Sequence, residues 1–422
     1  MPFGFYIIMA AQFFSALADN ALLIVAIAAL REMQAPAAYE PLLKTFFTVS
    51  YVALAAFVGA FADSMPKWRV MFISNAIKVI GCAMMFFGAH PLIAYAVVGL
   101  GAAAYSPAKY GILTEYLPHR LLVVANGWIE GLTVGAIILG VVIGGALIQP
   151  SVAQSILSFD FPLIDTGIDT ISEMALLFIG LFYLIASAFN LYIPETGVDH
   201  KILHSNPWYL IREFNHCVAL LWRDRLGQIS LAVTTLFWGA GATLQFIVIK
   251  WAEVSLHLDL SKSSMLQGVV AIGVALGAVG AARAITLRKS VRVIPLGIAM
   301  GIIVLVMNFV SHVWLAVPLL VIIGALSGYF VVPMNALLQH RGHILMGAGH
   351  SIAVQNFNEN LSILMMTGFY YLMVKFDLSI YWVITLFGLF VSGSMLLVKR
   401  RHEANQREHD DVIHLDDNGS GH

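Results

Sequence analysis

Ionisable side chains stand inside several long apolar stretches of this sequence. Near the middle of such stretches we find Asp19, Lys78, Glu130 and Glu359. An ionisable residue at the centre of a bilayer costs about 2.5–3.5 kcal/mol on insertion scales, so it usually lines a polar cavity or pairs with a partner. These four residues are therefore candidates to bind a polar or charged solute inside a membrane.

Uncharged polar residues share helix faces with these charges. At about 3.6 residues per turn, Gln355 lies on the same face as Glu359. The same spacing places Asn126 beside Glu130. Spacing and depth together predict a solute path lined by Asp19, Lys78, Lys109, Asn126, Glu130, Asn335, Gln339, Gln355 and Glu359. The alternative is that each polar stripe holds packed helices together through interhelical hydrogen bonds.

The composition places these residues in a membrane protein. Of the 422 residues, 59% are hydrophobic and 11% are charged, and the mean hydropathy is +0.84. Soluble domains carry roughly 25% charged residues, so this chain lacks the polar surface that they need. The net charge is −1 and no large basic patch appears, which argues against a nucleic-acid partner. We also expect no disulfide, metal site or other cofactor.

Twelve segments are long and apolar enough to cross a bilayer. A hydrocarbon core of about 30 Å needs about 20 apolar residues per helix. This rule predicts an all-α integral membrane protein with transmembrane helices at residues 5–30, 43–63, 69–89, 91–116, 120–149, 171–193, 227–252, 264–286, 291–310, 313–338, 347–374 and 378–398. The first segment is too long for the apolar part of a signal peptide, so we expect it to remain as a helix.

Lysine and arginine residues between the predicted spans are distributed unevenly. The loops on one side, together with the tail, contain most of them. The opposite side holds only Arg31, Lys44, Lys262 and Lys375. Because basic loops stay in the cytoplasm, both termini are expected there. The loop at residues 150–170 then lies outside, and its acidic residues Asp160, Asp165 and Asp169 are expected to form a solvated connection.

The two halves of the sequence carry weak internal matches. Pro107 in the fourth span corresponds to Pro333 in the tenth, and Phe14 in the first corresponds to Phe237 in the seventh at a similar offset. Duplicated bundles are common in transporters. We therefore predict two pseudo-symmetric six-helix bundles, residues 1–194 and 227–400, joined by a cytoplasmic linker at 195–226 and followed by a polar cytoplasmic tail at 401–422.

The loop after the second span contains a recognisable pattern. Gly59, Asp63, Lys67 and Arg69 follow the spacing Gly-x-x-x-Asp-x-x-x-Lys-x-Arg, which resembles the signature loop of major facilitators. The resemblance implies a major facilitator fold in which the acid and the two bases latch the two halves on the cytoplasmic side. The alternative is a charged turn that only follows the preference for basic residues on the inside.

Several longer segments resemble one family of these transporters. They are Ala18-Asp19-Asn20, Gly101-Ala-Ala-Ala-Tyr-Ser-Pro-Ala-Lys109-Tyr110, Phe237-Trp238-Gly, Val331-Val-Pro-Met-Asn335 and Ala353-Val-Gln355-Asn356. In this order they are similar to the bacterial lysophospholipid transporter family, and the resemblance runs from about residue 8 to about residue 400.

The resemblance implies a lysophospholipid flippase of the bacterial inner membrane. Such proteins move lysophosphatidylethanolamine and lysophosphatidylglycerol from the outer to the inner leaflet. There an acyltransferase–acyl-carrier-protein synthetase restores the missing acyl chain. The resemblance implies head-group or gating roles for Asp19, Lys109 and Glu359, and adds Asn20 and Tyr110 to the candidates. Gln245 is also a candidate, because it stands where the family has a basic residue.

Two other functions remain as alternatives. A major facilitator that exports drugs or small organic solutes would use the same fold and a similar polar path. A membrane-bound lipid enzyme would need a nucleophile or a His-x-x-x-x-Asp pair in a loop, and the sequence contains no such pair. We therefore expect a transporter without enzymatic activity whose partners are a lysophospholipid substrate and the surrounding membrane lipids.

Overall fold

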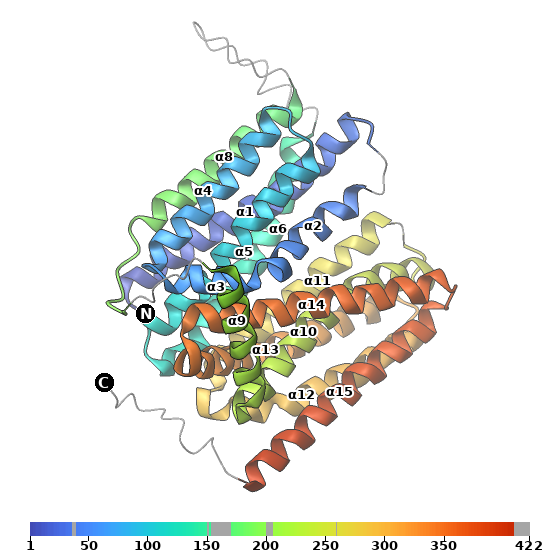
Figure 1. Cartoon of the computed structure of the whole chain (residues 1–422). Helices are drawn as coiled ribbons and strands as arrows, with labels where there is room; N and C mark the ends of the chain where they lie inside the picture. Colours follow the sequence, from blue (N-terminus) through green and yellow to red (C-terminus); the bar gives the residue numbers. More distant parts are fainter. Residues whose placement is uncertain (36–38, 150–151, 153–169, 200–205, 259, 409–422) are drawn as a thin grey trace, which may run out of the picture. The chain divides into compact units, whose positions relative to one another are not determined.

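The computed structural model describes residues 1–35, 39–149, 152, 170–199, 206–258 and 260–408. Within these ranges every regular element is a helix (Figure 1). Asp160, Asp165 and Asp169 of the predicted acidic loop lie outside the described residues, as does the predicted tail beyond Glu408.

The helices follow the apolar segments of the sequence. The α-helices are α1 (Phe3–Glu32), α2 (Tyr39–Ala53), α3 (Ala55–Asp63), α4 (Lys67–Phe86), α5 (Pro91–Tyr116), α6 (Leu122–Leu147), α8 (Ile171–Asn190), α9 (Pro207–Arg223), α10 (Arg225–Ser255), α11 (Leu260–Ala284), α12 (Ile294–Val306), α13 (Val313–Met346), α14 (Ala348–Lys375) and α15 (Ile380–Glu408). Short 3-10 helices precede α6 (η1, His119–Leu121), precede α12 (η2, Leu287–Val293) and follow α12 (η3, Met307–Phe309).

Each predicted span corresponds to one helix or to one bent pair. Among the described residues, 10 helices are long and apolar enough to cross a membrane, or up to 11 if a bent pair is one span. That pair is α2 and α3, which are bent by 63° around Leu54. The span predicted at 347–374 is α14, whose first half is too polar to meet the same criterion. The prediction of an all-helical membrane fold is confirmed.

The chain forms two compact units. The first contains residues 1–112 and 135–211, and the second contains residues 113–134 and 212–422. The helix α6 belongs to both, because its first half packs within the second unit and its second half within the first. The bundle boundaries predicted from the sequence stay a prediction.

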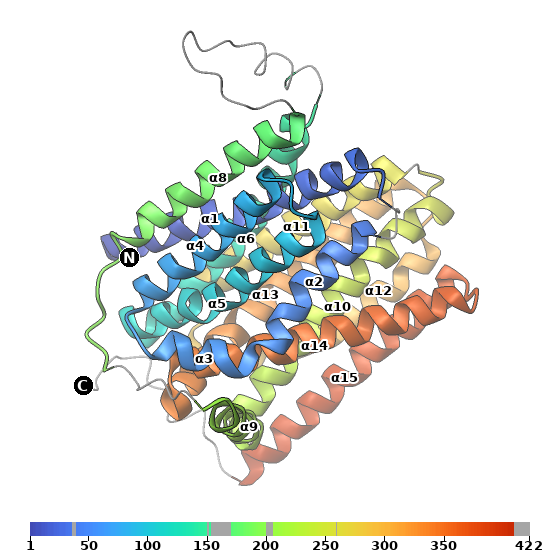
Figure 2. The same ribbon diagram turned by 45° about the horizontal axis from the view of Figure 1, so that its top comes forward.

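In the first unit, α8 packs against α1 and α4 (Figure 2). Leu22, Ile179 and Tyr183 are fully buried in the core that these helices share. A glycine brings α6 close to α1, since a Cβ at Gly140 would lie 2.7 Å from the carbonyl oxygen of Leu17. The helices that carry the predicted charges of this unit are thereby held together.

In the second unit, small residues let α11 pack closely along α13. A Cβ at Gly273 would lie 2.5 Å from the carbonyl oxygen of Val321, and Gly324 on α13 faces α11 in the same way. Small residues are typical of membrane helices that need close backbone contact. In the same unit α10 packs against α14, and α12 packs against α15.

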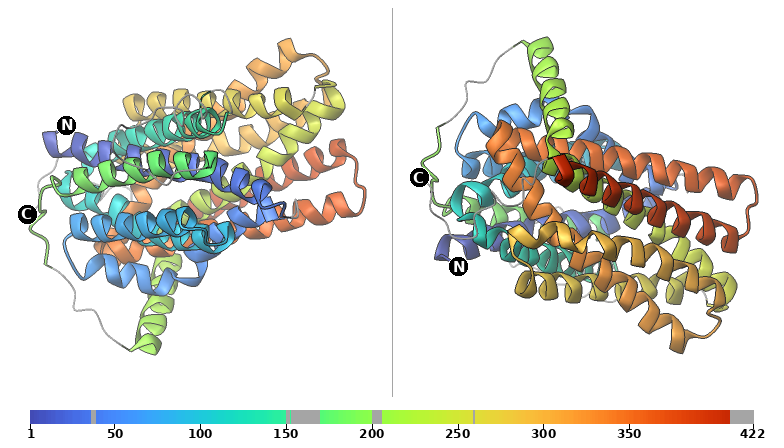
Figure 3. Two further views of the ribbon diagram at one scale, coloured as in Figure 1. Left: turned by 90° about the horizontal axis from the view of Figure 1, so that it is seen from above. Right: turned by 90° about the horizontal axis from the view of Figure 1, so that it is seen from below.

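The segment expected as a linker, residues 195–226, contains the helix α9. This light-green helix runs across the direction of α10, α14 and α15 (Figure 3). Leu210, Phe214, Cys217 and Leu221 are buried at helical spacing, so one face of α9 is apolar and covered. The hydropathy rule finds no helix here because a short amphipathic helix has no continuous apolar run.

Candidate functional site

Asp19 and Lys78 form an ion pair inside the first unit. Nζ of Lys78 on α4 lies 2.7 Å from Oδ2 of Asp19 on α1. The hydroxyl of Tyr183 on α8 donates to Oδ1 of the same carboxylate, also at 2.7 Å. Lys78 is 1% exposed, whereas the Asp19 side chain is 18% exposed. The carboxylate is therefore the accessible member of a pair whose ammonium is enclosed.

Neutral polar groups surround the ammonium of Lys78. It donates to Oγ of Ser15 at 3.0 Å, and Ser15 donates to Oδ1 of Asn75 at 2.8 Å. The ring of Tyr105 lies 5.0 Å from Nζ, within the range of a cation–π contact. Gly101 leaves room for the lysine, because a Cβ there would meet Cγ of Lys78 at 2.8 Å. Side chains from α1, α4, α5 and α8 therefore build one charged site.

Three further predicted residues lie on α1 and α5 of the same unit. The amide of Asn20 donates to the carbonyl oxygen of Ala16 at 2.8 Å, within its own helix. Nζ of Lys109 lies 4.3 Å from the ring centroid of its neighbour Tyr110, and both side chains are half-buried. Lys109 is one helical turn from Tyr105, so the polar face of α5 continues along the helix.

In the second unit, the side-chain amides of Asn126 and Gln339 pair with each other. Each donates to the oxygen of the other at 2.9 Å, and both are buried. The amide of Asn126 also donates to the carbonyl oxygen of Leu122 at 2.9 Å. The structure thus brings together two predicted residues that are far apart in the sequence, one on α6 and one on α13.

Glu359 lies next to two buried amide side chains, those of Gln355 and Asn335, close to this pair. Nε2 of Gln355 donates to Oε1 of Glu359 at 2.7 Å and to Oδ1 of Asn335 at 3.0 Å. Asn335 and Gln339 are one turn apart on α13, so α6, α13 and α14 present a polar belt of five predicted residues. Within the described part of the chain, Oε1 of Gln355 is buried and accepts no hydrogen bond.

Two predicted residues do not join these groups in the described structure. Gln245 on α10 is exposed, and its backbone carbonyl accepts a hydrogen bond from Gln267 at 2.7 Å. Glu130 lies on α6, at a position whose side chain is outside the described part.

The predicted signature loop contains a buried ion pair. Nζ of Lys67 at the start of α4 lies 2.8 Å from Oδ1 of Asp63 at the end of α3, and both residues are buried. Gly59 is buried one turn before Asp63. Arg69 is exposed, with its guanidinium 5.1 Å from the ring centroid of Trp68. The acid and the first base of the pattern are thus held together within the first unit.

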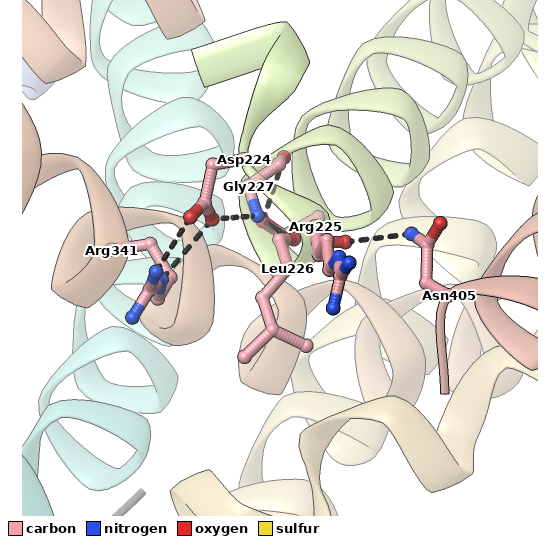
Figure 4. Close-up of polar contacts among 7 residues, drawn as sticks. Asp224, Arg225, Leu226, Gly227, Arg341 and Asn405 are labelled. Atoms are coloured by element: carbon pink, nitrogen blue, oxygen red, sulfur yellow. Dashed lines mark hydrogen bonds and ion pairs between the residues drawn. The ribbon is translucent and has the colours of Figure 1, made fainter. Parts of the chain in front are cut away.

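Asp224 and Arg341 form a third ion pair, which sequence reasoning missed. Figure 4 shows the carboxylate of Asp224 between the guanidinium of Arg341 and the backbone of Gly227. Arg341 donates from Nε at 3.1 Å and from Nη2 at 2.5 Å, and the N–H of Gly227 donates at 2.7 Å. One aspartate therefore caps the start of α10 and ties it to the end of α13. In Figure 4, Asn405 also donates to the carbonyl oxygen of Arg225, at 3.2 Å.

Two residues of these sites that sequence reasoning missed, Asp224 and Tyr183, nevertheless left a signal in the sequence. An aspartate directly before an apolar segment, such as Asp224, is a preferred N-cap residue. Tyr183 lies in the middle of the span predicted at 171–193, where a buried tyrosine hydroxyl usually needs a hydrogen-bond partner. Spacing within one helix does not show which partner that is, so the hydroxyl could not be assigned to Asp19.

A comparison with families of known proteins agrees with this arrangement. The family model described as Major Facilitator Superfamily matches residues 8–363. The all-helical fold and the polar residues buried within its spans are those of a membrane transporter, and the chain belongs to the major facilitator superfamily.

Its curated relatives define the family more narrowly. The lysophospholipid transporter LplT of Yersinia enterocolitica serotype O:8 / biotype 1B is 41% identical over 373 residues, 88% of this chain and 87% of that protein. The LplT of Yersinia pestis (strain Pestoides F) is 42% identical over 369 residues, 87% of this chain and 86% of that protein. The chain therefore belongs to the lysophospholipid transporter family of the superfamily.

Solved structures of more distant transporters share the fold. The human organic anion transporter MFSD10 (TETRAN) superposes with a TM-score of 0.73 at 14% identity, covering 95% of this chain and all of that one. A bacterial homologue of the iron transporter ferroportin, in an outward-facing state, gives a TM-score of 0.70 at 14% identity over 96% of this chain. At this identity the likeness is evidence of fold alone.

Proposed function

We propose that this protein transports lysophospholipids from the outer to the inner leaflet of a bacterial inner membrane. Relatives at 41–42% identity that are named for this cargo support the proposal. The structural observation that carries it is the ion pair of Asp19 and Lys78. A phosphoethanolamine head group contains the same two charges, one ammonium and one phosphate. Its ammonium replaces Lys78 beside Asp19, and its phosphate replaces Asp19 beside Lys78.

Unused hydrogen-bonding atoms beside this pair support the same proposal. Among the described residues, Nδ2 of Asn75 and the hydroxyl of Tyr105 are buried and have no hydrogen-bond partner. An unsatisfied buried polar group costs about 1–3 kcal/mol, so such groups favour a ligand that supplies the missing partner. A phosphate accepts hydrogen bonds from both, which adds affinity for this part of the head group.

The polar belt of the second unit suits the other distinctive group of a lysolipid. Loss of one acyl chain leaves a free hydroxyl on the glycerol backbone, and a two-chain lipid has no hydroxyl at that position. Oε1 of Gln355 is a buried acceptor for such a hydroxyl. A site built to bond a hydroxyl discriminates strongly against analogues without it, because its own polar group is then left unpaired. In this proposal Gln355, with Asn335 and Glu359, selects one-chain lipids.

The remaining parts of the proposal rest on charge distribution and on the family. The excess of basic residues on one side supports the proposal that both termini are cytoplasmic. In this proposal, the loop with Gly59, Asp63, Lys67 and Arg69 acts as the cytoplasmic latch. Lysophosphatidylethanolamine and lysophosphatidylglycerol are the proposed cargoes, and a cytoplasmic acyltransferase–acyl-carrier-protein synthetase consumes them by restoring the second chain.

Uptake of fluorescent lysophosphatidylethanolamine by right-side-out membrane vesicles tests this function. We expect vesicles with the wild-type protein to take up the lipid, and Asp19→Asn to lower uptake roughly tenfold or more, as expected from one lost charged contact. The matched control is Lys250→Met, since Lys250 is 55% exposed and lies 3.7 Å from Glu253. Equal lipid movement with and without folded, inserted protein would contradict the proposed cargo and favour export of a small organic solute.

A further inference from the structure

The helix α9 has one covered face and one exposed face. Its covered face carries Leu210, Phe214 and Leu221, and the ring of Phe214 packs edge-on against Phe357 of α14 at a centroid distance of 5.5 Å. On the exposed face, Trp208 is 78% exposed. A tryptophan this exposed on a membrane protein is typical of the boundary between acyl chains and head groups.

Two contacts with α14 fix how α9 is rotated about its own axis. The indole N–H of Trp222 donates to Oδ1 of Asn358 at 3.3 Å. Oε2 of Glu213 lies 3.7 Å from Nε2 of His350. His350 and Asn358 are about 12 Å apart along the helix axis at 1.5 Å per residue. His350 lies in the first turn of α14, and Asn358 lies further into the helix. Trp222 therefore points toward the middle of α14, while Glu213 points toward the first turn of α14.

This rotation divides the exposed face of α9 into two flanks. At about 100° per residue, Trp208 and Ile211 share the flank of Trp222, which faces the middle of α14. The flank of Glu213, with His216 and Arg223, faces away from it. The axis of α9 lies across α10 and α14 (Figure 3), so the residues of this aromatic flank lie at a similar level along those helices.

Basic residues lie along the same helix. Arg212 and Arg223 are exposed, and α9 leads directly into Arg225 at the start of α10. This is the end of the spans at which the sequence concentrates its lysines and arginines. Basic side chains beside an aromatic flank complement a surface of anionic phospholipid head groups.

We propose that α9 binds the surface of the membrane leaflet on the side of the basic loops. Trp208, Ile211 and Trp222 insert at the boundary between acyl chains and head groups. Arg212 and Arg223 bind phosphates of anionic lipids. α9 therefore anchors the start of α10 at a fixed depth, and this role does not depend on which solute the protein transports.

Fluorescence quenching at two positions of α9 tests the proposal. Trp208→Cys on the aromatic flank and His216→Cys on the opposite flank are each labelled with bimane in the full-length protein, in nanodiscs of phosphatidylcholine and phosphatidylglycerol. The native Cys82 and Cys217 are buried, so labelled wild-type protein gives the background. We expect lipids with a spin label near the head group to quench the label at 208 several-fold more than the label at 216, and aqueous iodide to show the reverse. Equal quenching by iodide at both positions would overturn the proposal.

The lipid composition tests the role of the arginines. Replacing phosphatidylglycerol by phosphatidylcholine should weaken lipid quenching at position 208, and Arg212→Gln with Arg223→Gln should remove this dependence. Lipid quenching at 208 that is the same in both compositions would overturn the assignment of anionic lipid as the partner. Gel filtration of each variant confirms that the protein is folded before it is compared.

Discussion

The side-chain amides of Asn126 and Gln339 form a closed pair, each donating to the other at 2.9 Å. Asn126 comes from the first half of the sequence and Gln339 from the second. Residues 113–134 thus pack as part of a unit that otherwise begins at residue 212. The pair is buried, so a change that removes Asn126 leaves the amide of Gln339 buried without this partner.

Asn126→Ala should destabilise the protein by about 1–3 kcal/mol, because the amide of Gln339 is left buried and unsatisfied. The double variant Asn126→Leu, Gln339→Met replaces both amides by apolar groups of similar size and should recover most of the melting temperature. We expect the double variant to be stable but slow in lysolipid uptake. Normal uptake by this variant would show that the pair serves only to hold the helices together.

Lys78→Met should lower stability by about 3 kcal/mol, since it leaves the carboxylate of Asp19 without its cation. Adding Asp19→Asn removes the stranded charge, so the double variant should melt at a higher temperature than Lys78→Met. Thermal unfolding in detergent gives the melting temperatures of the wild-type protein, Lys78→Met and the double variant. If the double variant is the least stable, the ion pair is not the main interaction of Lys78.

Asp224 has two roles that different substitutions separate. Asp224→Ser keeps an oxygen that can cap Gly227 but loses the ion pair with Arg341. Asp224→Ala loses both, and should therefore be less stable than Asp224→Ser by about 1 kcal/mol. The melting temperatures of the two variants give the comparison. Equal values would mean that the cap adds nothing to the stability of α10.

Close packing of α11 predicts opposite effects for two glycines on the same helix. A Cβ at Gly277 would overlap the carbonyl of Ala325, so Gly277→Ala should destabilise the protein by about 1–3 kcal/mol. Gly268 has no atom within 4 Å of such a Cβ, so Gly268→Ala should be neutral or stabilising by up to about 1 kcal/mol. Thermal unfolding of both variants, measured side by side, checks this difference. A loss of stability at Gly268 alone would contradict the packing.

The sequence is a good guide to the helices because a bilayer leaves the backbone few alternatives. Every backbone group in lipid needs an internal partner, so each long apolar segment becomes a helix. Pro107 and Pro333, which suggested the repeat, both lie inside helices, α5 and α13. The end of α15 was harder to predict, since the helix continues to Glu408 through polar residues. Contacts such as that of Arg401 with Gln228, at 3.2 Å, accompany this extension.

Partners within the site could not be read from spacing along one helix. Depth predicts that Asp19 and Lys78 lie at a similar level, but their contact depends on how α1 and α4 are rotated. Asn335, Gln339 and Gln355 lie in one polar belt because their stripes face the interior of one unit. Gln245 was chosen by resemblance alone, and it lies on an exposed face of α10.

The burial of Lys78 has a consequence for how the chain is made. A membrane helix with a lysine near its centre inserts poorly alone, at a cost of about 2.5–3.5 kcal/mol. Because α1 is synthesised before α4, the carboxylate of Asp19 is already in the membrane when Lys78 arrives. Tyr183 is synthesised last and closes the site. We therefore expect α1 to act as an assembly partner during biogenesis, so that α4 completes its insertion against a helix made earlier on the ribosome.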